Sequence, residues 1–399
     1  MPKNIDRTTF DESYDLTPSK VQSIFKSANS GNVQKQCRLA NELTEKDPAI
    51  SQAWSVRVSA IASCPWEIVG EDLEKAERVN SILSRIQPQY DSGLVSFNKL
   101  LQYLQSAVLQ GFSVAETFYE NGGSNIEGFK LYSQSLFSFT DSDLPLYVDK
   151  TANTKRPLEY PRWIYHTATN ARESEPLRSG IVRPLAYLYS MRRHFQIQWS
   201  RGAEKYGIPM PVVKVDEFLY EDSEKRQELE QALLDWTYDG HMVIQDSGGG
   251  NIDIQFPTAS AGFDKDIFQS YLEFSEKQIF RIILGQDSTS SADNSNRSTA
   301  QVHNLVRGDM LASDAIAVQA TVNDQIIKPL CMAIYGNTDN MPVFKFRLKG
   351  VSEMKEYADL AKTLKESGFE IQPDELSMRM GIDVTKIVNI ENNEGDLND

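Results

Sequence analysis

GIVRPLAYLYSMRRHFQIQWSRGAEKYGIP, residues 180–209, is the part of the sequence that says most about the fold. Pro184 stands near the start of a long run without helix breakers, and Gly207 and Pro209 close that run. Proline is tolerated in the first turn of a helix, whereas glycine and proline just beyond the last turn stop it. The sequence therefore predicts one long helix over residues 184–206.

The same stretch is a basic exception within an acidic chain. The whole chain has 41 lysines and arginines against 56 acidic residues, a net charge of −15. Residues 178–206 have six cations against Glu204, which gives 6 − 1 = +5; the cations are Arg178, Arg183, Arg192, Arg193, Arg201 and Lys205. A protein that grips DNA usually has a basic surface, because neutralising phosphates supplies most of its non-specific affinity. The overall balance therefore disfavours a DNA-gripping protein, but it permits one past which DNA slides.

Upstream of this stretch, helical patterns give way to a period of two. Thr17 and Pro18 open a helix, and Asp47 can cap another whose apolar residues recur at helical spacing. From Phe112 the apolar residues alternate with polar ones, which is typical of strands. Helices are expected to open at Thr17–Pro18, to cover residues 32–46, 71–86 and 97–109, and to follow Asp47 with Ile50, Trp54, Val58 and Ile61 on one face; strands are expected at 64–69, 112–119, 128–132, 146–148 and 163–166. This part is predicted to be a mixed region of helices and strands.

Downstream, a small β-α-β-β block is inserted between two long helices. The block has expected strands at 212–215, 242–244 and 252–256 and a helix at 223–236. The second long helix, over residues 264–284, is acidic and is followed by a polar stretch over 286–298. A third long helix is expected over 299–335, bent by Pro329. A strand at 343–348, a helical hairpin at 352–367 and 373–380, and an acidic tail follow.

Motifs for catalysis are missing from the sequence. The glycines at 248–250 lack the following Lys-Ser or Lys-Thr of a phosphate-binding loop, so a hairpin turn is expected there. The four histidines, His166, His194, His241 and His303, have no metal-site spacing, and no nucleophile elbow is present. We expect a protein without enzymatic activity, metal or cofactor.

Composition bounds the class of protein further. With 40% apolar and 24% charged residues the chain is typical of a globular protein, and it contains no apolar run long enough to span a membrane. The start of the sequence lacks the apolar core of a secretory signal. Cys37, Cys64 and Cys331 are odd in number and far apart, which favours folding in a reducing compartment.

Several segments, taken in order, resemble the portal protein family of Mu-like tailed phages and prophages. They span roughly residues 15–350, and their order and spacing carry the resemblance more than any single motif does. The segments are LANELTEKD (39–47), IASCPWEI (61–68), GIVRPLA (180–186), EKYGIP (204–209), LGQ (284–286), VHNLVR (302–307) and IIKPL (326–330).

The resemblance implies an α+β portal fold assembled as a ring, commonly of twelve subunits. It implies N-terminal helices and an α/β wing over 1–179, a first stem helix over 180–206 and a clip over 207–257. A second stem helix over 258–285, a tunnel loop over 286–298, and a long wing helix with its closing strand over 299–350 would follow. A helical crown over 351–388 and an acidic tail over 389–399 complete the expected order.

The resemblance also implies a function in the virion. The ring would form the channel at one capsid vertex through which double-stranded DNA enters and leaves, without sequence specificity. Its partners would be the terminase large subunit, a head–tail connector or adaptor, and the major capsid protein, with no membrane involved. The chain would be made in the host cytoplasm.

Two groups of residues are candidates for this function. The tunnel loop would place short polar side chains beside DNA: Gln286, Asp287, Ser288, Thr289, Ser290, Ser291, Asp293, Asn294, Ser295, Asn296 and Arg297. The stem would use Arg183, Arg192, Arg193, Arg201 and Lys205 on the first helix, and Asp264, Asp266, Glu273 and Glu276 on the second. The stem cations could face DNA or pair with the acidic helix of a neighbouring subunit, and we favour the pairing because ring closure needs complementary faces.

Two other functions remain open from the sequence. A phage nuclease or hydrolase would need a clustered metal or nucleophile site. A monomeric adaptor or scaffold would use the helical hairpin to bind partners, and the polar stretch 286–298 would then be an ordinary surface loop.

Overall fold

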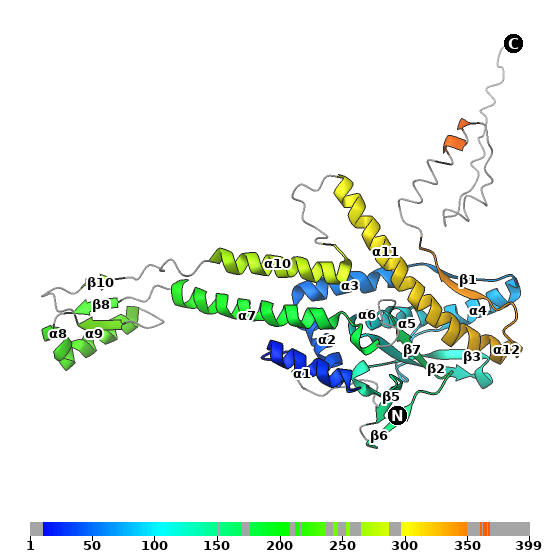
Figure 1. The fold of residues 1–399 in the computed structure, drawn as a ribbon, viewed down its shortest axis with the longest axis horizontal. Helices are drawn as coiled ribbons and strands as arrows, with labels where there is room; N and C mark the ends of the chain where they lie inside the picture. The colour runs from blue at the N-terminus through cyan, green and yellow to red at the C-terminus, as the bar shows by residue number, and fades with distance from the viewer. Residues whose placement is uncertain are drawn as a thin grey trace, which may run out of the picture. The chain divides into compact units, whose positions relative to one another are not determined.

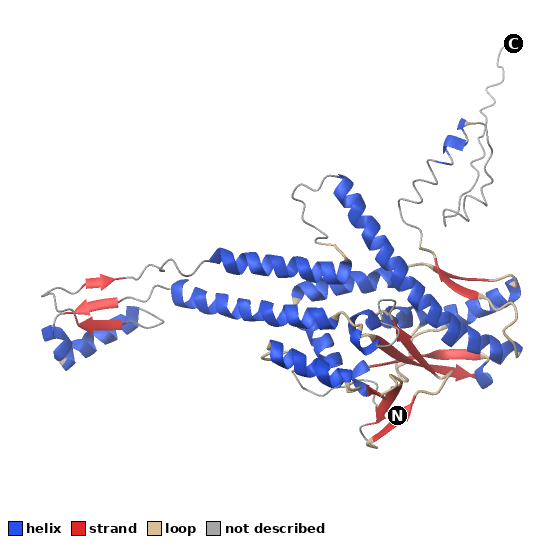
Figure 2. Cartoon of the chain, in the orientation of Figure 1, coloured by secondary structure: helices blue, strands red, loops and turns tan. Residues whose placement is uncertain are grey.

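A computed structural model describes residues 11–149, 152–168, 176–207, 212–215, 217–236, 242–245, 253–255, 265–286, 297–348, 360, 362–364, 366 and 367. Helices and strands are mixed along the chain, which confirms the predicted α+β class (Figures 1 and 2). The predicted crown lies almost wholly outside the described residues, and the acidic tail entirely so. The chain divides into two compact units: unit 1 is Met1–Arg7, Ser55–Gly180 and Asn294–Asp399, and unit 2 is Thr8–Trp54 and Ile181–Asp293.

Unit 1 contains three small antiparallel sheets. The central one has the order β3-β2-β7, and the others are β4-β5-β6 and the pair β1-β11. Their strands are β1 (Trp66–Val69), β2 (Phe112–Glu120), β3 (Asn125–Tyr132), β4 (Phe137–Phe139), β5 (Pro145–Asp149), β6 (Thr154–Pro157), β7 (Trp163–Thr167) and β11 (Val343–Phe346). The alternation of apolar residues from Phe112 onward predicted the β2–β3 hairpin, and the structure confirms it.

Helices cover these sheets and build a core rich in aromatic rings. They are α4 (Leu73–Arg85), α5 (Phe97–Leu104), α6 (Ser106–Gln110), α11 (Arg297–Val322) and α12 (Lys328–Tyr335). Phe97 is fully buried, and its ring lies 6.0 Å from that of Phe129 and 5.5 Å from that of Phe344. Edge-to-face and tilted ring pairs of this kind add about 0.5–1.5 kcal/mol beyond the area that they bury.

Two of the expected helices are interrupted where amide side chains bind residues of other elements. The helix expected over 97–109 divides at Gln105, whose buried amide donates to the carboxylate of Asp314. The helix expected to bend at Pro329 instead contains a π-helical turn, Asn323–Ile327, just before α12. Pro329 is the second residue of α12 and directly follows this turn.

The π-helical turn places two amide side chains against two different sheets. Asn323 donates from Nδ2 to the carbonyl of Phe344 (3.1 Å) and accepts from its N–H (2.7 Å). Gln325 makes the same pair of bonds with the backbone of Tyr165, both at 2.8 Å. Each amide therefore continues the hydrogen-bond ladder of a strand edge, so the helix joins the β1-β11 pair to the central sheet.

Gly180 shows where backbone packing in unit 1 leaves no room for a side chain. A Cβ at this position would lie 2.6 Å from the carbonyl oxygen of Leu109 and 2.6 Å from the carbonyl carbon of Gln110. Because both atoms belong to the backbone, we expect Gly180→Ala to lower the free energy of unfolding by about 3 kcal/mol, the upper end for overpacking. Urea unfolding of the variant measures this.

The matched control is Gly308→Ala. An added Cβ there meets nothing within 4 Å, and the position is exposed on α11. Alanine in a helix interior is more stable than glycine by up to about 1 kcal/mol, so this variant should be unchanged or slightly stabilised. Equal urea midpoints for the two variants would contradict the packing argument.

Unit 2 combines four helices with a small α/β block. The helices are α1 (Pro18–Asn29), α2 (Gln34–Lys46), α7 (Val182–Gly207) and α10 (Lys265–Leu284). The block consists of β8 (Val212–Val215), α8 (Glu217–Glu221), α9 (Ser223–Trp236), β9 (Met242–Gln245) and β10 (Asp253–Gln255). Its sheet has the order β10-β8-β9, with β8 and β9 parallel, over a core of Val213, Val215 and Leu233. The β-α-β-β prediction is confirmed, with α8 as an additional short helix.

Candidate functional site

Helices α7 and α10 of unit 2 lie side by side and contain most of the predicted stem residues (Figure 1). Aromatic side chains join them: the ring of Phe195 stacks on that of Tyr271 with centroids 4.0 Å apart, and Phe268 lies 6.0 Å from Phe195. The predicted boundaries of the first helix are confirmed to within two residues at each end. The sequence therefore identified the elements that carry the candidate site.

Arg192 differs from the other stem cations because it is buried. Its Nη1 lies 3.0 and 3.1 Å from the two carboxylate oxygens of Asp47. Asp47 also accepts hydrogen bonds from the backbone N–H groups of Ala49 (2.9 Å) and Ile50 (3.1 Å), which caps helix α3 (Pro48–Ala62). Since Arg192 is only 9% exposed and is paired within its own chain, it has little surface to offer a neighbouring subunit or DNA.

Helical spacing contains a signal for this burial. Leu185, Tyr189 and Arg192 stand at positions i, i+4 and i+7, and they share one face of α7 that is buried against the unit. A basic residue on an otherwise apolar face indicates an internal ion pair, because an unpaired buried charge is costly. The partner, Asp47, lies 145 residues earlier and is not visible from local pattern.

Arg183 also makes contacts within the unit. Its Nη2 donates to Oδ1 of Asn29 at 2.7 Å, and its guanidinium lies 4.9 Å from the ring centre of Phe25. Both partners belong to α1, so this arginine ties the beginning of α7 to the N-terminal helices. The cation and the aromatic ring attract each other through the ring quadrupole.

The remaining described stem residues form two exposed stripes of opposite charge. On α7, Arg193, Ile197 and Arg201 are exposed at positions i, i+4 and i+8, so they share one face, which we call the basic stripe. On α10 the exposed residues Asp266, Gln269, Glu273 and Glu276 follow at i, i+3, i+7 and i+10, and we call them the acidic stripe; the exposed Lys277 at i+11 adjoins it, so this face has three carboxylates and one cation. The side chain of Lys205 and all of Asp264 lie outside the description.

The predicted tunnel loop is described only at its two ends. Helix α10 ends at Leu284, where Gly285 adopts a left-handed backbone, and α11 begins at Arg297. Gln286 is buried, at 7% exposure, rather than facing solvent as expected for a loop residue. The other candidate loop residues, Asp287, Ser288, Thr289, Ser290, Ser291, Asp293, Asn294, Ser295 and Asn296, lie outside the described part of the chain.

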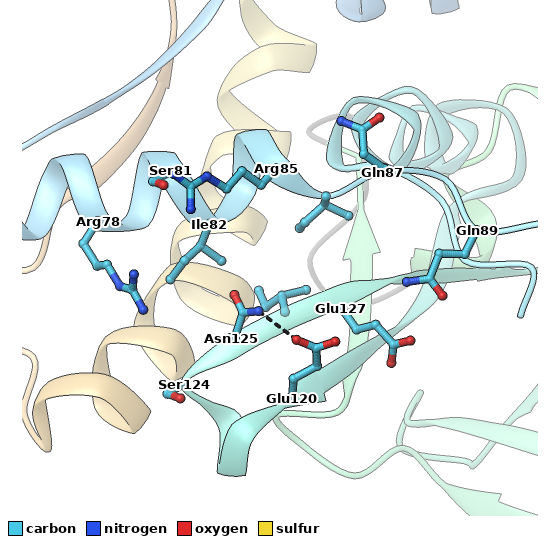
Figure 3. Close-up of a pocket in the computed structure, with 12 residues that line it drawn as sticks. Arg78, Ser81, Ile82, Arg85, Gln87, Gln89, Glu120, Ser124, Asn125 and Glu127 are labelled. Carbon is cyan, nitrogen blue, oxygen red and sulfur yellow. Dashed lines mark hydrogen bonds between the residues drawn. The ribbon is translucent and has the colours of Figure 1, made fainter.

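A cavity of about 390 Å³ lies in unit 1 between α4 and the β2–β3 hairpin. Arg78 and Arg85 lie along its helical wall, and Glu120 and Glu127 along the hairpin wall, where Asn125 donates to Glu120 at 2.9 Å (Figure 3). Its lining lacks a cysteine, a histidine and an aspartate. Among the described residues no group of three or more potential metal ligands exists, and no helix there is long and apolar enough to cross a membrane.

His166, a histidine without metal spacing in the sequence, lies in the core of unit 1. Its Nδ1 is 2.7 Å from the hydroxyl of Thr321, and burial lowers its pKa to about 4. In the unfolded chain a histidine has a pKa of about 6.5, so between pH 6.5 and 4 the unfolded state binds a proton that the folded state does not. We expect this histidine to cost about 3 kcal/mol of stability as the pH falls through that range, with no effect above it.

Replacing this side chain tests the assignment. His166→Asn keeps an amide near Thr321 but cannot titrate. As the pH is lowered below 6.5, the free energy of unfolding of this variant should therefore fall less steeply than that of the wild type. Urea unfolding between pH 7 and 4 measures both slopes. The exposed His194→Asn is the control, and identical slopes for wild type and His166→Asn would show that His166 is accessible to protons in the folded state.

Comparison with known proteins decides the family. The family model described as the portal protein of Mu bacteriophage matches residues 37–382. The chain belongs to this family. The resemblance found in the sequence is thereby confirmed, and the chain is a portal protein by function.

Individual relatives agree with this assignment. The chain is 26% identical over 377 residues to the Mu-like prophage FluMu protein gp29 of Haemophilus influenzae, covering 89% of this chain and 68% of that protein. It is 25% identical over 333 residues to the portal protein of Escherichia phage Mu, covering 81% of this chain and 62% of that protein. The chain thus spans about two thirds of the length of these relatives.

A solved structure shares the fold of this chain. The structure of the neck of a native gene transfer agent particle, computed with C12 symmetry, contains a chain that matches with a TM-score of 0.55 and 12% identity. The match covers 93% of this chain and 95% of the other. At this identity the likeness concerns the fold alone.

Proposed function

We propose that copies of this portal protein close into a ring of twelve, in which the basic stripe of one subunit meets the acidic stripe of the next. The observation that carries this proposal is that α7 and α10 each have an exposed face, and that the charges of the two faces are opposite. A closed ring joins subunits head to tail, so it needs two different faces that complement each other. The C12 symmetry of the neck structure with the matching fold supports the number twelve.

The dimensions of the two stripes support their pairing. Arg193 and Arg201 are separated by eight residues, or about 12 Å along a helix. Asp266 and Glu276 are separated by ten residues, or about 15 Å, with Glu273 between them. An exposed apolar side chain stands within the basic stripe, because Ile197 on α7 is 39% exposed; on α10 Phe274 is 54% exposed and directly follows Glu273, but on a neighbouring face of the helix. Apolar area and charges together favour a protein interface over a surface that tracks DNA.

We propose that DNA passes through the centre of this ring during packaging and ejection. A chain with a net charge of −15 repels phosphates, but only near contact, because the Debye length is about 8 Å at physiological salt. Residues 286–298 would serve as the tunnel loop, whose hydroxyl and amide groups contact DNA without gripping it. Lysine at Ser288, Ser290 and Asn294 should therefore slow packaging in vitro at low salt, with partial recovery at high salt; normal rates in both would contradict the placement.

The other segments and partners follow from the family. Unit 1 would form most of the wing, α7 and α10 the stem, residues 207–257 the clip and residues 351–388 the crown. The clip would bind the terminase large subunit and later the head–tail connector, and the wing would contact the major capsid protein. We propose a location at one vertex of the virion, after synthesis in the host cytoplasm, and no enzymatic activity of the chain itself.

Two measurements test the proposed ring. Size-exclusion chromatography with light scattering should give a mass near twelve subunits, and electron microscopy of the same fraction should show rings with a central hole. A stable monomer would favour the adaptor function instead. Stoichiometric binding of ATP in calorimetry, abolished by a point substitution, would favour an enzyme.

A further inference from the structure

Helix α7 is held from two opposite sides within its own subunit. Arg183 and Arg192 are nine residues apart, which is about 2.5 helical turns, so they project in opposite directions. Arg183 binds Asn29 and covers Phe25 on α1, whereas Arg192 binds Asp47 at the junction of α2 and α3. Rotating α7 about its own axis would break both contacts at once.

The buried ion pair has a property that apolar packing lacks. Replacing a buried ion pair with packed apolar side chains is often neutral or stabilising, so Arg192 and Asp47 are not needed for stability alone. Hydrogen bonds, however, depend on direction as well as distance, and Nη1 of Arg192 lies within 3.1 Å of both oxygens of Asp47. Asp47 is itself fixed, because two backbone N–H groups of α3 bind the same carboxylate. The pair therefore determines the rotation of α7 more tightly than apolar contacts would.

The rotation of α7 determines where the basic stripe points. Arg193 directly follows Arg192, and Ile197 and Arg201 continue the same face one and two turns later. The acidic stripe is on α10, which is joined to α7 by the stacked rings of Phe195 and Tyr271. The angle between the two stripes is thus set inside one subunit, before any neighbour binds.

We propose that the Arg192–Asp47 pair, with Arg183 on the opposite face, is a positioning device that sets the number of subunits in the ring. This inference rests on the proposed ring. In a closed ring each interface turns by 360° divided by the number of subunits, so twelve and thirteen subunits differ by only about 2° per interface. A helix free to settle at slightly different rotations would allow more than one number.

The test uses a double variant that removes the ion pair without leaving a buried charge. Asp47→Asn keeps an oxygen that caps α3, because asparagine is as good an N-cap as aspartate. Arg192→Met keeps an apolar stem of similar length. Native mass spectrometry of assembled rings, with thermal unfolding of the same samples, should show a folded protein whose single ring mass splits into several masses one subunit apart.

The control removes another arginine–aspartate pair with little exposure, this one from unit 1. Arg57 donates from Nε and Nη2 to the two oxygens of Asp314, both at 2.9 Å, and both side chains are nearly buried. Arg57→Met with Asp314→Asn should lower the melting temperature by a similar amount and leave the ring mass unchanged. Splitting in this control would show that general destabilisation, not the rotation of α7, changes the ring.

The outcomes separate this inference from the function that it builds on. A folded double variant with the single ring mass of the wild type overturns the inference and leaves the ring intact as a proposal. A wild-type protein without rings overturns the proposed function itself. If the double variant does not fold, Arg183→Met, at a half-buried position, takes its place and should also split the ring mass; one unchanged mass there overturns the inference equally.

Discussion

Reversing the charge of Glu273 and Glu276 together to arginine should abolish ring assembly while leaving the subunit folded. Both side chains are exposed on α10, so the substitution removes little from the core of unit 2. In the ring it would place arginines opposite Arg193 and Arg201 at every interface, and like charges across an interface cost several kcal/mol. Light scattering should show monomers in place of rings, and circular dichroism should be unchanged.

A compensating change gives this prediction its specificity. Arg193→Glu with Arg201→Glu should also prevent assembly, and combining all four substitutions should restore rings, because the two stripes are then complementary again with their signs exchanged. Glu74→Arg with Glu77→Arg, on the exposed face of α4, is the control with the same change in net charge. Rings formed by the Glu273/Glu276 variant, or monomers from the control, would exclude the stripes as the interface.

Deleting residues 212–256 and joining the ends by a short linker should give rings that cannot package DNA. The deleted block has its own sheet and its own core of Val213, Val215 and Leu233. Since these residues form a core of their own, their loss should leave α7 and α10 folded. An in vitro packaging reaction should fall to background, because we propose that this block is the clip to which the terminase binds.

A point variant tests whether packaging needs the clip to be folded or only to be present. Val213 is completely buried, so Val213→Asp places an unpaired charge in the small core and should unfold this block alone. We expect intact rings by electron microscopy and packaging as poor as that of the deletion. Normal packaging by either variant would mean that the terminase binds elsewhere on the ring.

The sequence predicted those parts of the structure that depend on neighbours along the chain. The helix at α7 is visible because Pro184 and Gly207 mark its ends, and the β2–β3 hairpin because apolar residues alternate. The division of a helix at Gln105 and the π-helical turn at Asn323–Ile327 were not predicted, since their causes are bonds to Asp314, Phe344 and Tyr165 far along the chain.

The candidate site was predictable to the same extent. Composition showed the basic first helix and identified four carboxylates on the second, and the structure describes exposed charges at Arg193, Arg201, Glu273 and Glu276. Composition did not distinguish Arg192 from Arg193, although Arg192 is buried and Arg193 is exposed. A count of charges treats every arginine and lysine alike. Whether Arg192 is buried depends instead on its position in the helical period and on Asp47, 145 residues away.

The interleaving of the two units has a consequence for how the protein is made on the ribosome. Unit 2 needs Thr8–Trp54 and Ile181–Asp293, and unit 1 needs Ser55–Gly180 and residues after Asn294. Helices α1 and α2, which contact α7 and contain the buried residues Val21, Ile24, Leu39 and Leu43, therefore emerge long before α7 does. At about 5–20 residues per second this delay is on the order of ten seconds, during which a nascent chain exposes apolar surface. Newly made subunits should thus depend on chaperones that bind nascent chains more than a protein whose units follow one another in sequence.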